Sequence, residues 1–279
     1  MELASRFGTP LYVFDEETLR QNCRQFREAF ASRYHQSQVL YASKAFINPA
    51  LARIMASEGL GLDVVSGGEL AVARSVEFPA RNIYFHGNNK TRSELEQAVQ
   101  YGIGRVVVDG FNELSLLNHA AGKRGAVQEI LLRVSPGVDP HTHAHIATGV
   151  VDSKFGFPLR DGQAEEAIRQ AICLPNLNLV GLHCHIGSQI FEVEPYVEAI
   201  QVMLRFAAEL HRRHGFELME FSPGGGFAVQ YLAGLPAPPV AKYAEAITSN
   251  VLSLCKELDI TPPRLVVEPG RGIVARAGV

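Results

Sequence analysis

Residues 39–74 read VLYASKAFINPALARIMASEGLGLDVVSGGELAVAR and contain two successive units of the same kind. In each unit a short apolar run, at 39–43 and again at 61–65, precedes a longer segment with helical periodicity. Apolar runs that alternate with amphipathic helices are typical of βαβ units with parallel strands. This stretch therefore predicts an α/β fold.

The same alternation continues through the rest of the chain. The predicted strands are 39–43, 61–65, 82–85, 105–108, 130–134, 179–184, 218–221 and 265–267. The helices predicted between them are 49–57, 68–74, 93–101, 113–123, 164–171, 194–214 and 243–257. Eight parallel strands joined by helices make a TIM (β/α)8 barrel, and 279 residues suit one such domain. We therefore predict that residues 1–279 form a single barrel.

Two stretches do not follow this alternation. Residues 136–158 are rich in His, Gly and Pro without a clear period, so we expect a long, functional loop there. Only EPGRGIVARAGV, residues 268–279, follows the last predicted strand, and this is too short for the closing helix of a standard barrel. We therefore expect that the barrel lacks this helix or ends in an unusual way.

The composition is that of a globular protein with a large buried core, with 47% hydrophobic and 20% charged residues. The formal net charge of −3 comes without a basic stripe, which argues against a nucleic-acid partner. The four scattered cysteines form no CxxC pair, which favours a reducing compartment. No apolar run approaches the roughly 20 residues that span a bilayer, and the first residues do not resemble a signal peptide. We therefore expect a cytoplasmic protein without a nucleic-acid or membrane partner.

Polar residues follow nearly every predicted strand. The active sites of TIM barrels lie at the C-terminal ends of the strands, so these residues are the first candidates for function. In chain order they are Lys44, Asp63, Ser66, His86, Asn88, Asp109, Arg133, His183, His185, Gly224, Gly225, Gly226, Glu268 and Arg271. Packing alone does not explain so regular an array.

Lys44 ends the first strand between small residues, Ser43 and Ala45, that leave room for a planar cofactor. A lysine removed from water can act as a Schiff-base nucleophile. A lysine that snorkels from a strand end is the alternative explanation. The other candidates at the same end of the barrel favour the nucleophile.

The run Gly224, Gly225, Gly226 directly follows an apolar strand, which allows backbone amides to approach a phosphate closely. A tight turn is the alternative. Ser188, after the preceding strand, is placed to add a hydroxyl to the same anion site, since phosphate sites in barrels often use the loops of late strands. The two features together predict a phosphate site.

Glu268 ends the last strand, where burying a carboxylate without a partner is costly. A pyridinium nitrogen is one suitable partner, and a protonated ring nitrogen makes such a ring an electron sink. An ion pair between Glu268 and Arg271 is the alternative. Arg271 could instead hold a substrate carboxylate through its planar guanidinium.

His183 and His185 occupy alternate strand positions and are predicted to face the same side. A His-x-His pair also begins the metal site of many barrel hydrolases, so a zinc-dependent hydrolase stays open as an alternative. We predict no metal, because His141, His143 and His145 lie in a loop without a helical His-x-x-x-His spacing. These loop histidines are interpreted as solvated or substrate-contacting.

Seven motifs taken together resemble the fold-type-III pyridoxal-phosphate decarboxylases, in their order and in their spacing. The motifs are YASKA, DVVSGGE, HGNNK, RVSPGVDPHTH with TGVVDSKFGF, LHCHIGSQI, SPGGGF and VEPGR. Within that family the DPHTH loop and the HCHIGSQ strand look most like the diaminopimelate decarboxylases. The resemblance covers nearly the whole chain and implies an alanine-racemase-like barrel that binds pyridoxal 5'-phosphate.

The resemblance also implies roles for single residues. Lys44 is expected to be the Schiff-base lysine, His185 the histidine that stacks on the cofactor ring, and Glu268 the partner of the ring nitrogen; these three are the expected catalytic residues. Further cofactor contacts are expected from Asp63, His86, Ser188, Gly224, Gly225, Gly226, Gly270 and Arg271. Arg271 is also expected to bind substrate.

The implied reaction is the decarboxylation of meso-2,6-diaminopimelate, a small amino-acid substrate, to L-lysine and carbon dioxide. Family members are expected to be homodimers with a C-terminal β domain, which this chain lacks, so we expect a truncated form with poor turnover. Another decarboxylase of the family, acting on ornithine, arginine or carboxynorspermidine, is an alternative. A non-catalytic barrel that binds pyridoxal phosphate is another.

Overall fold

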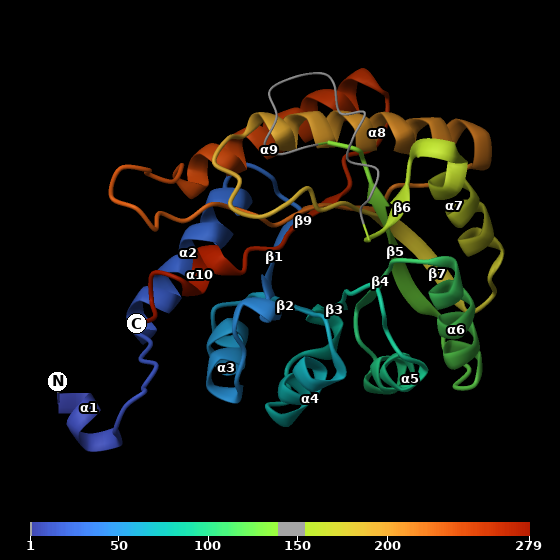
Figure 1. Ribbon diagram of the computed structural model, residues 1–279. Coiled ribbons are helices and arrows are strands. Elements are labelled where there is room, and N and C mark those ends of the chain that lie inside the picture. The colour runs from blue at the N-terminus through green and yellow to red at the C-terminus, as the bar shows by residue number, and fades with distance from the viewer. Residues whose placement is uncertain (1, 139–153) are drawn as a thin grey trace.

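Eight parallel strands form a closed ring in the computed structural model, which describes residues 2–138 and 154–279 (Figure 1). The strands of the ring are β1 (Ser37–Ala42), β2 (Gly61–Val64), β3 (Ile83–Phe85), β4 (Arg105–Val108), β5 (Gln128–Ser135), β7 (Leu177–His183), β8 (Glu220–Gly224) and β9 (Arg264–Val267). Each strand pairs with the next in this order, and β9 pairs with β1 to close the ring. The predicted TIM barrel is confirmed.

Helices surround this ring. They are α2 (Glu16–Ala31), α3 (Pro49–Ser57), α4 (Gly67–Ser75), α5 (Arg92–Tyr101), α6 (Phe111–Gly122), α7 (Gln163–Cys173), α8 (Glu194–His214), α9 (Val240–Glu257) and α10 (Arg271–Val274). Helix α1 (Glu2–Phe7) has no buried residue and projects away from the barrel (Figure 1). Short 3-10 turns lie at η1 (Ser43–Ala45), η2 (Ala80–Asn82) and η3 (Arg160–Gly162). All the predicted strands and helices are present with ends shifted by a few residues, and α3 and α8 match their predicted bounds.

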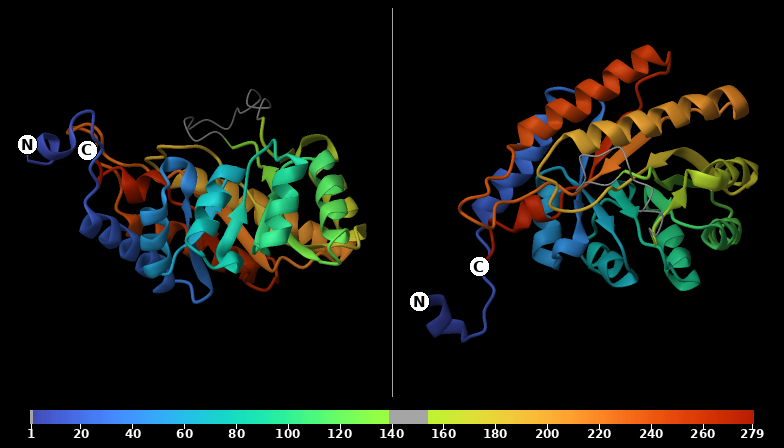
Figure 2. Two further views of the ribbon diagram at one scale, coloured as in Figure 1. Left: turned by 90° about the horizontal axis from the view of Figure 1, so that it is seen from below. Right: turned by 45° about the horizontal axis from the view of Figure 1, so that its top comes forward.

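The barrel ends in an unusual way, as one of the two expectations had it, because helix α2 and not a helix after β9 covers this part of the ring. Helix α2 precedes β1 in the chain, yet it contacts β1, α9 and α10 (Figure 2, right). Its buried face consists of Leu19, Cys23, Phe26 and Phe30, which recur at helical spacing. Asn22 also donates a hydrogen bond of 2.8 Å to the backbone oxygen of Ile273 in α10. A helix from before the first strand thus covers the place beside the last one.

The segment after β5 is only partly a loop. Residues 139–153, with His141, His143 and His145, lie outside the described residues. At its far end Phe157–Pro158 forms a short strand, β6, that pairs with β5 outside the ring. The prediction of an unbroken loop at 136–158 was therefore wrong at its C-terminal end, where the buried Phe157 packs into the core.

Side chains inside the ring form a small apolar cluster of their own. Its members are Leu40, Tyr84, Val107, Leu131 and Val266, one from each of five strands. Successive side chains of a strand alternate between the inside of a barrel and the helix layer. The residues two positions further along these strands therefore also point inward, at the C-terminal mouth of the barrel.

No helix within the described residues is long and apolar enough to cross a membrane.

Candidate active site

The inward positions at the mouth are polar, with the exception of Ala42. Two residues beyond the apolar cluster the chain places Ala42, His86, Asp109, Arg133 and Glu268. Asp63, His183 and Ser222 occupy the same level on the remaining strands, since the ladder pairs Ala42 with Asp63 and His183 with Ser222. A barrel with an apolar floor and a polar mouth is what an enzyme site needs.

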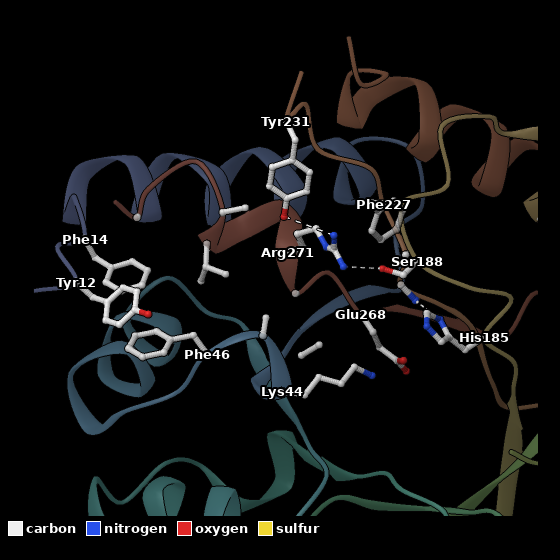
Figure 3. A pocket seen from close by; sticks show the side chains of 18 of the residues that line it. Tyr12, Phe14, Lys44, Phe46, His185, Ser188, Phe227, Tyr231, Glu268 and Arg271 are labelled. Carbon is white, nitrogen blue, oxygen red and sulfur yellow. Dashed lines mark hydrogen bonds between the residues drawn. The ribbon is translucent and has the colours of Figure 1, made fainter. Parts of the chain in front are cut away.

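A cavity of about 840 Å³ opens above this level (Figure 3). Among the predicted site residues it is lined by Lys44, His185, Ser188, Gly225, Gly226, Glu268, Gly270 and Arg271. The buried Asp63 and His86 lie behind Lys44 and Glu268. The fold thus brings together residues that are up to 227 positions apart in the sequence, from Lys44 to Arg271.

Glu268 is held as a buried carboxylate. Its Oε1 accepts a hydrogen bond of 2.8 Å from the Ser222 hydroxyl, and its Oε2 lies 3.1 Å from Nε2 of His183. Nε2 of His86 lies 3.6 Å from Oε1. Burial acts to raise the pKa of Glu268, but the two histidines and Ser222 outweigh it and hold this pKa well below its usual range. The carboxylate is therefore ionised at the base of the cavity.

Burial lowers the pKa of both histidines beside Glu268, and the charge of Glu268 acts against this. Their rings meet edge to face with centroids 4.9 Å apart. Ligand atoms of His86, His183 and Glu268 lie within 4.8 Å of one another. His185, which the zinc alternative pairs with His183, lies apart from this group: its Nδ1 accepts a hydrogen bond of 3.3 Å from the Gly225 amide.

Lys44 reaches the cavity from η1, directly after β1. Its side chain is 52% exposed, and its Nζ lies 3.8 Å from Oδ2 of the fully buried Asp63. Figure 3 shows the Lys44 amine and the Glu268 carboxylate pointing toward each other across the cavity floor. Lys44 therefore does not snorkel away from the barrel but presents a free amine to the cavity.

Glycine is required in this run because backbone atoms of other segments lie too close to leave room for a Cβ. A Cβ on Gly225 would lie 2.1 Å from the Glu268 backbone oxygen, and one on Gly226 would lie 2.4 Å from that of Gly187. The Gly224 amide donates to Ser222 Oγ at 3.1 Å, and Gly224 does not line the cavity. Gly225 and Gly226 both line the cavity, and the Gly226 amide has no hydrogen-bond partner in residues 2–138 and 154–279, so an anion can bind at this wall.

Arg271 lies on the same side of the cavity as the glycine run. Its guanidinium donates to Ser188 Oγ at 3.1 Å and to the Tyr231 hydroxyl at 3.5 Å, as Figure 3 shows. Within the described residues the alternative ion pair between Arg271 and Glu268 is not formed. A guanidinium, a hydroxyl and a free amide together make a site for a phosphate or carboxylate.

A scan against protein-family models matches residues 16–275 to a family described as pyridoxal-dependent decarboxylase, pyridoxal binding domain. This chain belongs to the pyridoxal-dependent decarboxylases. The match covers the barrel from α2 to α10, so the cofactor is pyridoxal phosphate. The fold-type-III resemblance found in the sequence is thereby confirmed.

Curated relatives and solved structures point to the same family. The diaminopimelate decarboxylase of Halalkalibacterium halodurans is 44% identical over all of this chain and 63% of its own length. The diaminopimelate decarboxylase of M. jannaschii, solved in complex with L-lysine, has a TM-score of 0.92 and 38% identity, and the alignment covers 99% of this chain and 64% of that one. A lysine/ornithine decarboxylase from Vibrio vulnificus, complexed with cadaverine, has a TM-score of 0.81 and 27% identity over 99% of this chain and 67% of that one. The chain thus spans less than two thirds of the length of the diaminopimelate decarboxylases it matches.

Several residues of this decarboxylase site were not predicted from the sequence. Ser222 donates to Glu268 beside the predicted candidate His183, and the period of two along β8 could have placed Ser222 at the barrel mouth. Tyr12, Phe14, Phe46 and Tyr231 form an aromatic wall of the cavity. The rings of Phe14 and Phe46 stack with centroids 4.6 Å apart. The apolar stretch PLYVF at 10–14 was the available signal for the first two.

Proposed function

We propose that this chain is the cofactor-binding barrel of a diaminopimelate decarboxylase, which converts meso-2,6-diaminopimelate to L-lysine and carbon dioxide. The observation that carries the proposal is the pairing of a free Lys44 amine with an ionised, buried Glu268 in one cavity. Whole-chain identity of 44% to a diaminopimelate decarboxylase favours this substrate over those of other family members.

The residues present fit pyridoxal phosphate. Lys44 would hold the cofactor covalently through Nζ, and the ionised Glu268 would keep a proton on the ring nitrogen. His185, at the cavity wall beside Gly225, would stack on the ring. When bound, the cofactor supplies an electron sink for the electrons that departing carbon dioxide leaves behind. Glu268 is suited to this task because its carboxylate is already oriented by Ser222 and His183.

The anion side of the cavity would hold the phosphate. We assign this contact to Ser188, Gly225 and Gly226, with Gly270 beside them at the cavity wall. Gly224 was expected to take part, but its amide is bonded to Ser222 Oγ and it does not line the cavity. The Gly226 amide and the Arg271 guanidinium would be the main donors, since both residues line the cavity. Arg271 would also bind a substrate carboxylate, because its planar guanidinium can serve two oxygens at once.

We further propose residues 1–279 as one barrel domain of a protein that carries a C-terminal β domain and acts as a homodimer in the cytoplasm. The support is that the relatives extend well beyond the matched region. Turnover by the 279-residue chain alone should then be poor. Ornithine, arginine or carboxynorspermidine as substrate, and a barrel that binds the cofactor without catalysis, are the competing outcomes.

Borohydride reduction with pyridoxal phosphate, followed by peptide mass mapping, tests the proposal. One stable adduct on Lys44, and none in Lys44→Arg, is the expected result. Adducts spread over surface lysines would reject Lys44 as the attachment site. Assays of carbon dioxide release from diaminopimelate, ornithine and arginine by the longest available form of the protein then separate the substrates.

A further inference from the structure

Three side chains with atoms that can bind a metal ion converge at the cavity floor. Nε2 of His86, Nε2 of His183 and a carboxylate oxygen of Glu268 lie within 4.8 Å of one another. The three residues belong to three different strands of the ring, at the ends of β3, β7 and β9. The zinc alternative from the sequence paired His183 with His185, so this group is a different one.

The backbone of the barrel holds the three donors in place. The His86 amide donates to the Val64 oxygen at 2.8 Å, and the Glu268 amide donates to the Gly224 oxygen at 3.1 Å, so both residues prolong the ladders of their strands. His183 is the last residue of β7. His86, His183 and Glu268 are only 3%, 1% and 6% exposed. Ligands that are fixed in this way lose little conformational entropy when an ion binds.

Nε2 of His86 is a buried polar atom that the fold leaves unsatisfied. It has no hydrogen-bond partner in residues 2–138 and 154–279. Oε1 of Glu268 lies 3.6 Å from it, and Oδ1 of Asp63, a second buried carboxylate, lies 3.8 Å from it. A buried polar atom without a partner is costly, and so are two neighbouring carboxylates without a cation. A positive ion bound to this nitrogen would relieve both costs.

The spacing of the donors is close to that of a tetrahedral metal site. Two donors at about 2.0–2.1 Å from one zinc ion are about 3.3 Å apart. Nε2 of His183 lies 3.1 Å from Oε2 of Glu268, and Nε2 of His86 lies 3.6 Å from Oε1. The two imidazole nitrogens lie within 4.8 Å of each other, so they would have to approach by at most about 1.5 Å. Small rotations of the two side chains are sufficient for this.

The chemistry of the donors favours zinc. Two histidines and one glutamate are the ligands of a known class of zinc sites, in which water fills the fourth position. Mg²⁺ and Ca²⁺ prefer oxygen ligands alone. Zinc also binds a given set of nitrogen and oxygen donors more tightly than Mn²⁺ or Fe²⁺ does. The carboxylate of Glu268 is already ionised, as a zinc ligand has to be.

We propose that His86, His183 and Glu268 bind a zinc ion when the barrel holds no cofactor, and that this ion and pyridoxal phosphate exclude each other. Glu268 lines the cavity, so an ion from solvent can reach it. The exclusion rests on the proposed function, because it takes Glu268 as the partner of the ring nitrogen, whereas the zinc site does not. The Lys44 amine, which points toward Glu268, is a positive charge that opposes the ion (Figure 3).

Zinc titration of the cofactor-free 279-residue protein against a chromophoric chelator measures the affinity and the number of sites. His141, His143 and His145 form a second sequence that can bind zinc, so the titration is repeated with all three replaced by glutamine. Nitrogen NMR of protein labelled with ¹⁵N at histidine then shows which ring nitrogens bind the ion. In this background we expect shifts at Nε2 of His86 and of His183. Shifts confined to other histidines would overturn the proposal.

Substitutions in the same background test the ligands one by one. His86→Leu should weaken zinc binding by at least about 100-fold, since the loss of a mere hydrogen-bond partner of a ligand costs about 10–100-fold. His185→Leu is the matched control and should leave the affinity unchanged, because His185 lines the same cavity but lies outside the group. Lys44→Gln should tighten zinc binding by about tenfold, because it removes the opposing charge.

An unchanged affinity in folded His86→Leu rejects the site. If His86→Leu does not fold, Glu268→Gln replaces it, since glutamine keeps the shape and one oxygen but loses the charge that the ion needs. Glu268→Gln should also weaken zinc binding by at least about 100-fold, and an unchanged affinity would count against the site in the same way.

The exclusion is tested with protein whose Lys44 carries the borohydride-reduced pyridoxal phosphate adduct. This protein should bind one zinc ion fewer than the cofactor-free protein and should show no zinc-dependent shift at His86. A full complement of zinc beside the adduct would overturn the exclusion. The zinc titration itself uses no cofactor, so a failure of Lys44 to form the adduct would reject the proposed function and not the zinc site.

Discussion

Lys44 and Lys90 both follow barrel strands at the C-terminal mouth, and each has a carboxylate on a neighbouring element. Lys90, with a side chain that is 1% exposed, donates to the backbone oxygens of Gly87 and Val107 and, at 2.7 Å, to Glu113. Every proton of that ammonium has an acceptor. Lys44 is half exposed, and its nearest carboxylate is 3.8 Å away.

The carboxylates differ in the same way. Oε1 of Glu113 accepts from Lys90, and its Oε2 accepts from the Asp109 amide at 3.1 Å. Burial raises the pKa of Glu113, but Lys90 opposes this. Asp63 is buried without a hydrogen bond among the described residues. A fully bonded pair fixes two connections of the barrel, whereas a loose pair leaves a lysine free to react.

The largest difference between the two lysines is expected when each is replaced by methionine. Lys44→Met should abolish the borohydride-trapped adduct with pyridoxal phosphate, since no other amine lies in the described cavity wall. At about pH 6, where its raised pKa leaves Asp63 mostly protonated, the free energy of unfolding should change by no more than about 1 kcal/mol, because the Lys44 side chain is half exposed. Peptide mapping and urea denaturation of one preparation measure both quantities. A large loss of stability would mean that Lys44 is a structural residue like Lys90.

Lys90→Met should lower the free energy of unfolding by about 3–5 kcal/mol, because it leaves the buried Glu113 without its cation. Urea denaturation measures this loss. The double variant Lys90→Met with Glu113→Leu is the control and should recover most of the stability, since an apolar pair of similar size replaces the ion pair. If Lys90→Met is as stable as the parent protein, Lys90 is not a structural residue, and the difference between it and Lys44 is not one of stability.

Asp63→Asn should have the opposite effect and raise the free energy of unfolding at about pH 8 by about 2–4 kcal/mol. The pKa of Asp63 is raised from 3.8 to about 7, so the folded state binds more protons than the unfolded state between these values. The contribution of Asp63 to stability is therefore favourable below about pH 4 and is lost as the pH rises to about 7. Thermal unfolding across this range should show a slope in the parent protein that is smaller in Asp63→Asn. Equal slopes would contradict the raised pKa.

The fold was predictable because its information is local. Each strand is a short apolar run and each helix an amphipathic one, so patterns within a few residues were sufficient. Helix α2 also carries such a pattern, in Leu19, Cys23, Phe26 and Phe30, after an N-cap at Asp15 whose side chain accepts from the Thr18 amide. It was not predicted because it precedes the first strand and so stands outside the strand–helix alternation, and its contacts with α9 and α10 depend on ring closure.

The site was predictable where a residue ends a strand. Lys44, Glu268 and His185 were found in this way, and all three line one cavity. Tyr231 was missed because it lies in an irregular connection, 40 positions from Arg271, where no period predicts contact. The bonding of Lys90 was not predictable either, since its partner Glu113 is 23 residues away on a different connection.

Glu113→Gln is expected to have the smallest effect and probes the bonded pair most finely. The glutamine oxygen can still accept from Lys90, but its amide group then points a donor at the Asp109 amide, which loses its acceptor. One buried donor left unpaired costs about 1–3 kcal/mol, so the free energy of unfolding should fall by this amount. Amide hydrogen exchange should show faster exchange at Asp109 and no change at Asp63. If stability is unchanged, the two backbone oxygens alone hold Lys90, and what separates it from Lys44 is the number of backbone acceptors and not the ion pair.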